Sequence, residues 1–195
     1  MTFPRVGLLP GSIRAASVHR KLAAALVPLL HGHDVDAELI DLGDYPMPLY
    51  HGDDEAAHGQ PAAAVALHDR LAGLDGLILV SPEYNGGPSA LIKNSIDWVT
   101  RVDRAVLTPL LVGLASASPG PRGGANGLSV MRSIIEHLRL EIVPDDLSIA
   151  QYGDAFDQHD GVPTLVRPHD IAAADRFVSG YAVRLHERAG AESVT

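Results

Sequence analysis

Five short, largely apolar segments alternate along the chain with longer segments in which apolar residues recur every three or four positions. Apolar runs of about four to eight residues are typical of strands buried in a sheet. The expected strands cover residues 6–9, 35–42, 76–80, 107–115 and the region of 140–143 or a little beyond. The periodic segments predict amphipathic helices over residues 17–30, 61–74, 89–101, 125–138 and 171–188.

Alternating strands and helices are typical of α/β folds with a parallel sheet. We therefore predict a doubly wound sheet of five parallel strands with helices on both faces. Polar residues at 43–60 predict a long loop after the second strand, and Ser17 and Ser89 stand where helix N-caps are expected. With 195 residues, the chain is long enough for one large core and short for two, so residues 1–195 are expected to form a single domain.

Glycine, serine, proline and asparagine are concentrated in three loops that follow expected strands, at residues 10–17, 81–88 and 116–124. In the strand order 2-1-3-4-5, the carboxyl ends of strands one, three and four are neighbours at the switch point of the sheet, where such folds bind ligands. We therefore predict this strand order, with a ligand site where the three loops meet.

The composition excludes several classes of protein. Hydrophobic residues make up 46% and charged residues 20%, as in soluble globular proteins. The absence of cysteine excludes disulfides, thiolate metal ligands and thiol nucleophiles. The first residues lack the apolar core of a signal peptide, and no window approaches the roughly 18 apolar residues of a membrane span, so we expect a cytoplasmic protein. The net charge of −9, without a basic block, disfavours nucleic acid and anionic membranes as partners.

The first loop has the residues of a phosphate site. Ser12, Arg14 and Ser17 precede a helix whose first turn leaves backbone N–H groups unpaired, and such groups bind phosphate together with a guanidinium. The plainer alternative is that Ser17 only caps the helix and Arg14 is solvated. The ATP-binding Gly-x-x-x-x-Gly-Lys-Ser/Thr and dinucleotide-binding Gly-x-Gly-x-x-Gly patterns are missing here. A mononucleotide is therefore favoured, with its phosphate at the first loop and a flat ring between the other two.

Two other kinds of active site find little support. The best histidine clusters, at residues 31–33 and 51–54, lack helical spacing of four residues and a thiolate partner, so no metal site is expected. A serine hydrolase of the common α/β type needs a Gly-x-Ser-x-Gly turn, which the chain does not contain.

Three motifs, in order and spacing, resemble the NADPH-dependent FMN reductase family. They are Gly11-Ser12-x-Arg14-x-x-Ser17, Pro82-Glu83-Tyr84-Asn85-x-x-Pro88-x-x-Leu91-x-Lys93-Asn94-x-x-Asp97-Trp98, and the serine- and glycine-rich loop ending Gly123-Gly124. The second motif is long and the most specific, and the resemblance spans roughly residues 5 to 145. That family is flavodoxin-like and includes flavin, quinone, chromate and azo-dye reductases.

The resemblance implies an oxidoreductase that uses FMN as cofactor and NADPH or NADH as co-substrate to reduce a small-molecule electron acceptor. It implies that the first loop binds the FMN phosphate and that the other two flank the isoalloxazine. The implied FMN-binding residues are Ser12, Arg14, Ser17, Val18, His19, Pro82, Glu83, Tyr84, Asn85, Gly86, Ser116, Ser118 and Gly123. Because the flavin carries the redox chemistry, no catalytic protein residue is implied.

Two features leave alternatives open. His19 stands where many relatives have a small polar residue such as asparagine, and we expect it either to donate to the phosphate when protonated or to be exposed. The alternative function is a flavodoxin-like electron carrier, or an FMN-binding module without turnover of its own. Such a carrier usually flanks its flavin with aromatic residues, and only 3 Phe, 1 Trp and 5 Tyr are present, which favours the reductase.

The helix expected at 89–101 predicts self-association. Its apolar residues fill an arc of roughly 160°, wider than the ~100° stripe that packs on one face of a sheet. Trp98 lies at the edge of this arc, and we expect it to anchor a contact with a second subunit. The alternative is a partly exposed Trp98 beside a row of charged residues. The resemblance implies a homodimer or a homotetramer.

Overall fold

The computed structural model of the chain describes residues 3–192. Its central sheet contains β1 (Arg5–Pro10), β2 (Asp36–Leu39), β3 (Gly76–Val80), β6 (Leu111–Ser118), β7 (Glu141–Ile142) and β8 (Leu147–Ala150). All pairs are parallel and the order is β2-β1-β3-β6-β7, with β8 also pairing with β6. The predicted order 2-1-3-4-5 is confirmed, although the fifth strand is divided into β7 and β8.

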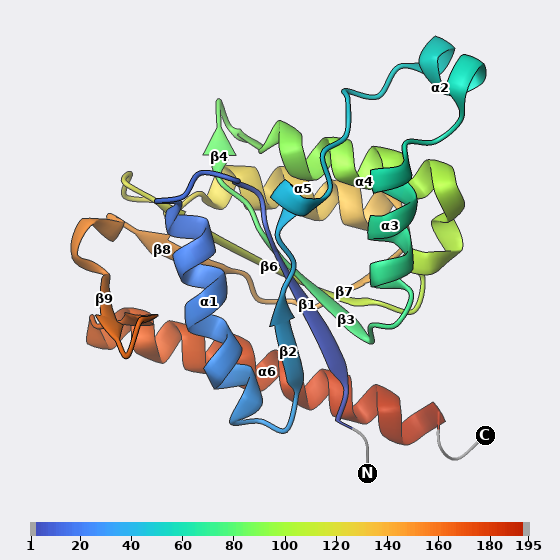
Figure 1. The fold of residues 1–195 in the computed structure, drawn as a ribbon. Helices are drawn as coiled ribbons and strands as arrows, with labels where there is room; N and C mark the ends of the chain where they lie inside the picture. Colours follow the sequence, from blue (N-terminus) through green and yellow to red (C-terminus); the bar gives the residue numbers. More distant parts are fainter. Residues whose placement is uncertain (1–2, 193–195) are drawn as a thin grey trace.

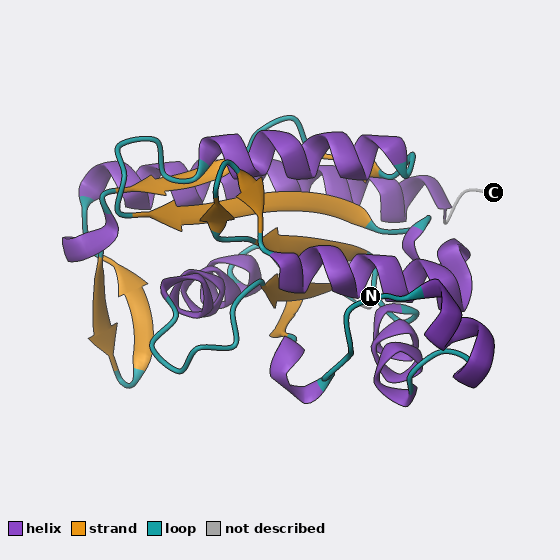
Figure 2. Ribbon diagram, turned by 90° about the horizontal axis from the view of Figure 1, so that it is seen from above, coloured by secondary structure: helices purple, strands orange, loops and turns teal. Residues whose placement is uncertain are grey.

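Helices cover both faces of this sheet (Figures 1 and 2). One face packs against the two helices α1 (Val18–His31) and α6 (Pro168–Glu192), and the other against α3 (Ala62–Leu71), α4 (Ala90–Asp103) and α5 (Ala125–His137). As a result there are two apolar cores, one on each side of the sheet. Among the described residues, no helix combines the length and the apolar character that a membrane span requires.

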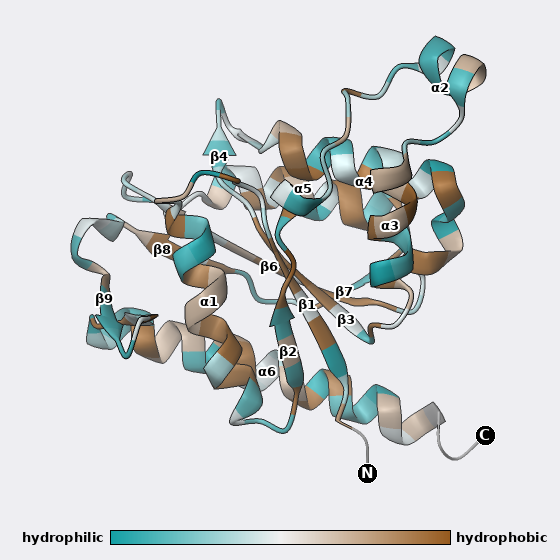
Figure 3. Ribbon diagram, viewed as in Figure 1, coloured by the Kyte–Doolittle hydropathy of each residue, from teal (hydrophilic) through white to brown (hydrophobic). Residues whose placement is uncertain are grey.

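The central strand β3 is apolar at every position because it contributes to both cores. Successive strand residues point to opposite faces. In β3, Ile78 and Val80 belong to the core under α1 and α6, whereas Leu77 and Leu79 belong to the core under α3, α4 and α5. Figure 3 shows the resulting hydrophobic colour at the centre of the sheet.

The prediction of a strand over residues 107–115 is wrong at both ends. Residues Arg104–Leu107 form a short 3₁₀ turn, η2, which is capped by the Asp103 carboxylate accepting from Ala105 N at 2.8 Å. Leu107 is buried without being in a strand, so an apolar run alone places the boundary too early. β6 then continues to Ser118, which carries the strand further toward the loops at its carboxyl end.

Sequence patterns did not predict two further elements. The helix α2 (Gly52–His58) lies inside the segment expected to be a loop, and none of its residues is buried. A hairpin of β9 (Phe156–His159) and β10 (Val162–Leu165) precedes α6. Both lie outside the central sheet. No residue of α2 is buried, and Phe156 and Leu165 of the hairpin are only partly buried against the core under α1 and α6, so neither element has the apolar periodicity from which elements are predicted.

The expectation that Trp98 anchors a second subunit is wrong, because its own chain covers it. Its side chain is 1% exposed, Nε1 donates to the Pro48 carbonyl at 2.8 Å, and the ring meets Tyr50 edge-on at 5.1 Å between centroids. Asn94 fixes the same segment, because its Nδ2 donates to Pro48 and its Oδ1 accepts from Tyr50 N. The wide apolar arc of α4 is therefore completed by residues 48–50 of the same chain.

Candidate functional site

A hollow of about 340 Å³ lies at the carboxyl edge of the sheet, where β1, β3 and β6 end. The three loops predicted from the sequence all contribute to it. Nine of its lining residues were predicted: Ser12, Arg14, Ser17, Val18, His19, Pro82, Glu83, Tyr84 and Ser118. Four further residues complete the lining: Ala16, Ala117, Pro119 and Tyr152. The predicted residues Asn85, Gly86, Ser116 and Gly123 are not part of this lining.

The first loop leads directly into the N-terminus of α1. Ser17 caps this helix, as predicted, by accepting from Arg20 N at 3.4 Å, and Ser17 N donates to the Arg14 carbonyl at 3.0 Å. The first turn of α1 contains no acidic residue that would offset the partial positive charge of the helix end. The Arg14 side chain forms no ion pair or hydrogen bond within residues 3–192. This end of the hollow therefore offers a cation and helix N–H groups to an anion.

The second loop forms a small hairpin between β4 (Glu83–Tyr84) and β5 (Gly87–Pro88). Its tip is Asn85-Gly86, with φ of 52° and 77°, the two left-handed positions of a type I′ turn, for which this dipeptide is favoured. Asn85 and Gly86 thus shape the hairpin from outside the hollow.

Ser81 ties the two ends of this loop together. Its Oγ donates to the Pro82 carbonyl at 3.0 Å and accepts from Ser89 N at 3.1 Å. Ser89 caps α4, as predicted, by accepting from Ile92 N at 3.3 Å. These contacts fix the loop between β3 and α4 at both ends.

Glu83 has a structural partner within the chain. Its carboxylate accepts from Gly127 N at 3.0 Å and from Asn126 Nδ2 at 3.4 Å, in the first turn of α5. A negative charge is stabilised at this end of a helix. Glu83 therefore lines the hollow while joining the second loop to α5.

The third loop passes over Ser116 at two left-handed glycines. Gly123 has a φ of 58° and Gly124 a φ of 91°. A Cβ on Gly124 would overlap the Ser116 hydroxyl, and a Cβ on Gly123 would lie 3.0 Å from the backbone of β8. Ser116 is fully buried, and its Oγ has no hydrogen-bond partner in the described part of the chain. Ser116 therefore lies beneath this loop, whereas Ser118 lines the hollow and accepts from Gly120 N at 3.1 Å.

The expectation that His19 is exposed is wrong, whereas its donation to a phosphate stays a prediction. Its side chain is buried, and Nε2 accepts from Ala117 N at 3.4 Å. Burial disfavours the charged imidazolium and lowers the pKa of His19 to about 4. At neutral pH the ring is therefore neutral, with its proton on Nδ1. It can serve as a hydrogen-bond donor without adding charge.

Tyr152 reaches the hollow from a part of the chain for which the sequence predicted no element. It lies in the short turn η3 (Tyr152–Asp154), directly after β8. Its hydroxyl makes no hydrogen bond within residues 3–192. The sequence feature that could have indicated this role is the position of Tyr152 directly after the fifth strand. The carboxyl end of that strand lies beside the carboxyl end of β6.

Two other hollows have similar volumes and different linings. One of about 370 Å³ lies at the opposite edge of the sheet, against Phe3, Arg5 and Asp36. Another, of about 340 Å³, lies between α4 and α5 and is largely apolar, with Ile96, Val130 and Ile134 in its wall. Neither combines a helix N-terminus with an unpaired cation. No cluster of three His, Cys, Asp or Glu side chains suited to a metal occurs in residues 3–192.

The sequence profile of the NADPH-dependent FMN reductase family matches residues 4–154, which is most of the chain. The chain belongs to this family. It is an oxidoreductase with FMN as its cofactor and NAD(P)H as its reductant. Among similar proteins is a 2-hydroxy-1,4-benzoquinone reductase from Burkholderia, 30% identical over 156 residues, which are 80% of this chain and 79% of the relative.

Solved structures confirm the flavodoxin-like fold. FerB, a flavoenzyme NAD(P)H:(acceptor) oxidoreductase from Paracoccus denitrificans, superposes with a TM-score of 0.77 at 24% identity, covering 94% of this chain and 98% of FerB. Flavodoxin 1 from Bacillus cereus superposes with a TM-score of 0.55 at 14% identity, covering 91% and 96% of the two chains. At these identities the similarity shows the fold alone.

The residues of the hollow fit FMN. A phosphate needs charge-assisted donors in a protein with a net charge of −9, and Arg14 and the acid-free first turn of α1 provide them. A flat ring needs an opening between loops, which residues 82–84 and 117–119 border. His19 adds a neutral donor in the same lining.

Proposed function

We propose that this hollow is the FMN site and that the chain uses it to pass two electrons from NAD(P)H to a small quinone. The observation that carries the proposal is the unpaired Arg14 beside Ser12 and Ser17 at the N-terminus of α1, on one edge of a hollow whose other edges are loops. Bound FMN would supply the redox chemistry, so the chain itself needs no catalytic acid or base.

The proposed roles follow the three loops. Ser12, Arg14 and Ser17 bind the phosphate, together with the N–H groups of Val18 and His19 in the first turn of α1. Residues 82–84 and 118–119 border the ring. Glycines 86 and 123 and Asn85 act through the backbone shape of their loops, and Ser116 supports the third loop from below.

A quinone is the proposed acceptor because the Burkholderia relative is named for the reduction of one. An electron carrier would not turn over NADPH with a quinone, which separates the two functions. We expect steady-state NADPH oxidation to need a quinone and to give parallel double-reciprocal lines at several quinone concentrations, because one open ring face admits the two substrates in turn. Intersecting lines would contradict this order, and an absence of turnover would favour the carrier.

Replacing Arg14 by alanine should weaken FMN binding about ten- to a hundredfold, the effect of losing one charge-assisted contact of roughly 1.5–3 kcal/mol. Riboflavin, which lacks the phosphate, should bind both forms equally. Arg176→Ala is the matched control, because it removes the same charge from the exposed surface of α6. Fluorescence titrations of the wild-type, Arg14→Ala and Arg176→Ala apoproteins with FMN and with riboflavin measure these affinities. An equal loss for FMN and riboflavin would show that Arg14 does not contact the phosphate.

We further propose that the chain is cytoplasmic and that it assembles into a homodimer or a homotetramer. Its lack of cysteine suits a reducing compartment, and Leu49, 76% exposed beside α2, is an apolar side chain that a second subunit could cover. Sedimentation equilibrium at micromolar concentration tests the assembly, and a monomeric mass for the FMN-loaded protein would refute it.

A further inference from the structure

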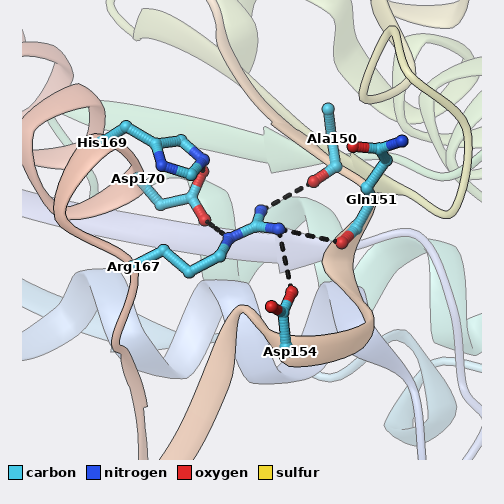
Figure 4. A network of polar contacts seen from close by, with 6 residues as sticks. All are labelled: Ala150, Gln151, Asp154, Arg167, His169 and Asp170. Atoms are coloured by element: carbon cyan, nitrogen blue, oxygen red, sulfur yellow. Dashed lines mark hydrogen bonds and ion pairs between the residues drawn. The ribbon is translucent and has the colours of Figure 1, made fainter.

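Arg167 joins the start of α6 to the turn that follows β8, as Figure 4 shows. Its Nε donates to Asp170 Oδ2 at 2.5 Å, and its Nη1 reaches the Asp154 carboxylate and the Gln151 carbonyl, each at 3.0 Å. Its Nη2 donates to the Ala150 carbonyl at 2.7 Å. We call this set of contacts the Arg167 clamp. The clamp uses all three guanidinium nitrogens, and its fork geometry is one that lysine cannot reproduce.

The Arg167 clamp is largely buried at Arg167 and Asp170, at the start of α6, and exposed at Asp154. The side chains of Arg167 and Asp170 are 16% and 4% exposed, whereas that of Asp154 is 82% exposed. His169 lies beside Asp170, with 3.4 Å between Nε2 and Oδ1. Asp170 compensates the charge of Arg167, so the guanidinium can be held close to two backbone carbonyls.

The turn held by the clamp has an unusual backbone. Gln151 adopts a left-handed conformation with φ of 48° and ψ of 49°, which is sparsely populated for a residue other than glycine. Its carbonyl accepts from Arg167, and its N–H donates to the Gly120 carbonyl at 3.1 Å. Contacts from α6 and from the third loop therefore fix Gln151 on both sides.

The next residue along the chain is Tyr152, which lines the hollow together with Ser118 and Pro119. The direction of Tyr152 depends on the left-handed turn at Gln151, and that turn depends on Arg167. Arg167 itself does not line the hollow, and it lies beyond residues 4–154, which match the family profile.

We propose that Tyr152 contacts bound FMN and that Arg167 is the residue that positions it. The inference rests on the proposed FMN site. Arg167 acts through Tyr152, so the effect of changing Arg167 on FMN affinity must disappear once the Tyr152 side chain has been removed.

The test is a double-mutant cycle on FMN affinity, measured by fluorescence titration of the apoproteins. Arg167→Lys keeps a positive charge beside Asp170 but cannot bond to Asp170 and both carbonyls at once. We expect Arg167→Lys and Tyr152→Ala each to weaken FMN binding about three- to tenfold. In the Tyr152→Ala background, Arg167→Lys should change the affinity by less than about twofold.

Arg184→Lys is the matched control, because Arg184 is on the same helix and pairs with Glu141 and Glu187 away from the hollow. It should leave FMN affinity unchanged. If Arg167→Lys does not fold, Arg167→Gln with Asp170→Asn replaces it, because that pair removes the fork and leaves no uncompensated charge.

Three results would overturn the inference: an unchanged affinity in Tyr152→Ala, an unchanged affinity in the Arg167 variant, or an equal loss from the Arg167 change in both backgrounds. Failure of the wild-type protein to bind FMN would instead refute the proposed function. The two failures are therefore distinguishable in the same titration.

Discussion

Replacing Gly124 by alanine should destabilise the apoprotein by about 2 to 4 kcal/mol, through backbone strain and overlap with the residue beneath. The φ of 91° is one that side-chain-bearing residues rarely adopt. A Cβ at this position would also overlap the Ser116 hydroxyl and lie 2.8 Å from Ser116 Cβ. Because Ser116 is fully buried in β6, its side chain has no space into which to move. Urea unfolding should show a lower midpoint with an unchanged slope.

Gly120→Ala is the control for this substitution, since Gly120 is in the same loop. Its added Cβ would meet Ser118 Oγ at 3.5 Å, an ordinary contact, so its effect should stay within about 0.5 kcal/mol. The double variant Ser116→Gly with Gly124→Ala should recover the part of the loss that comes from overlap and keep the part that comes from φ. Equal midpoints for Gly120→Ala and Gly124→Ala would contradict the structure of this loop.

Lowering the pH from 7 to 4 should reduce the free energy of unfolding by about 3 kcal/mol through the titration of His19. Each unit of pKa shift between the unfolded and folded states corresponds to about 1.4 kcal/mol. Burial lowers the pKa of His19 from 6.5 in the unfolded chain to about 4 in the folded protein. The unfolded chain therefore binds a proton that the folded protein excludes, and low pH favours unfolding. The contribution is complete above pH 6.5 and is lost as the pH falls toward 4.

His19→Gln isolates this effect, because glutamine offers an oxygen to Ala117 N and does not titrate. The difference in unfolding free energy between wild type and variant should shift by about 3 kcal/mol in favour of the variant between pH 7 and pH 4. Carboxylates such as Asp41 titrate in both proteins, so their contribution cancels. A constant difference over this range would show that His19 is accessible to protons in the folded state.

Local patterns in the sequence predicted what depends on local chemistry. The unbroken apolar run at 76–80 is a strand because both faces of β3 are buried, and Ser17 and Ser89 cap their helices through neighbours three residues away. The three loops meet at the hollow because parallel strands place their carboxyl ends on one edge of the sheet. These inferences need no knowledge of distant contacts.

Predictions that depend on particular side-chain contacts between distant residues were wrong or absent. The wide helical arc indicated that Trp98 must be covered, but a segment 50 residues earlier in the same chain covers it, where a second subunit was expected. The neutral state of His19 depends on its burial against distant parts of the chain, among them Ala117, 98 residues away. Tyr152 reaches the hollow because Arg167, at the start of α6, holds its turn. No periodicity in the sequence encodes such pairs.

We propose that the hollow at the N-terminus of α1 binds FMN through its phosphate. Titration of one preparation of apoprotein with FMN and with riboflavin tests this most directly, because the two ligands share the ring and differ in the phosphate. We predict that FMN binds at least about tenfold more tightly, since each charge-assisted contact to the phosphate contributes roughly 1.5–3 kcal/mol. Equal affinities for FMN and riboflavin would contradict the claim.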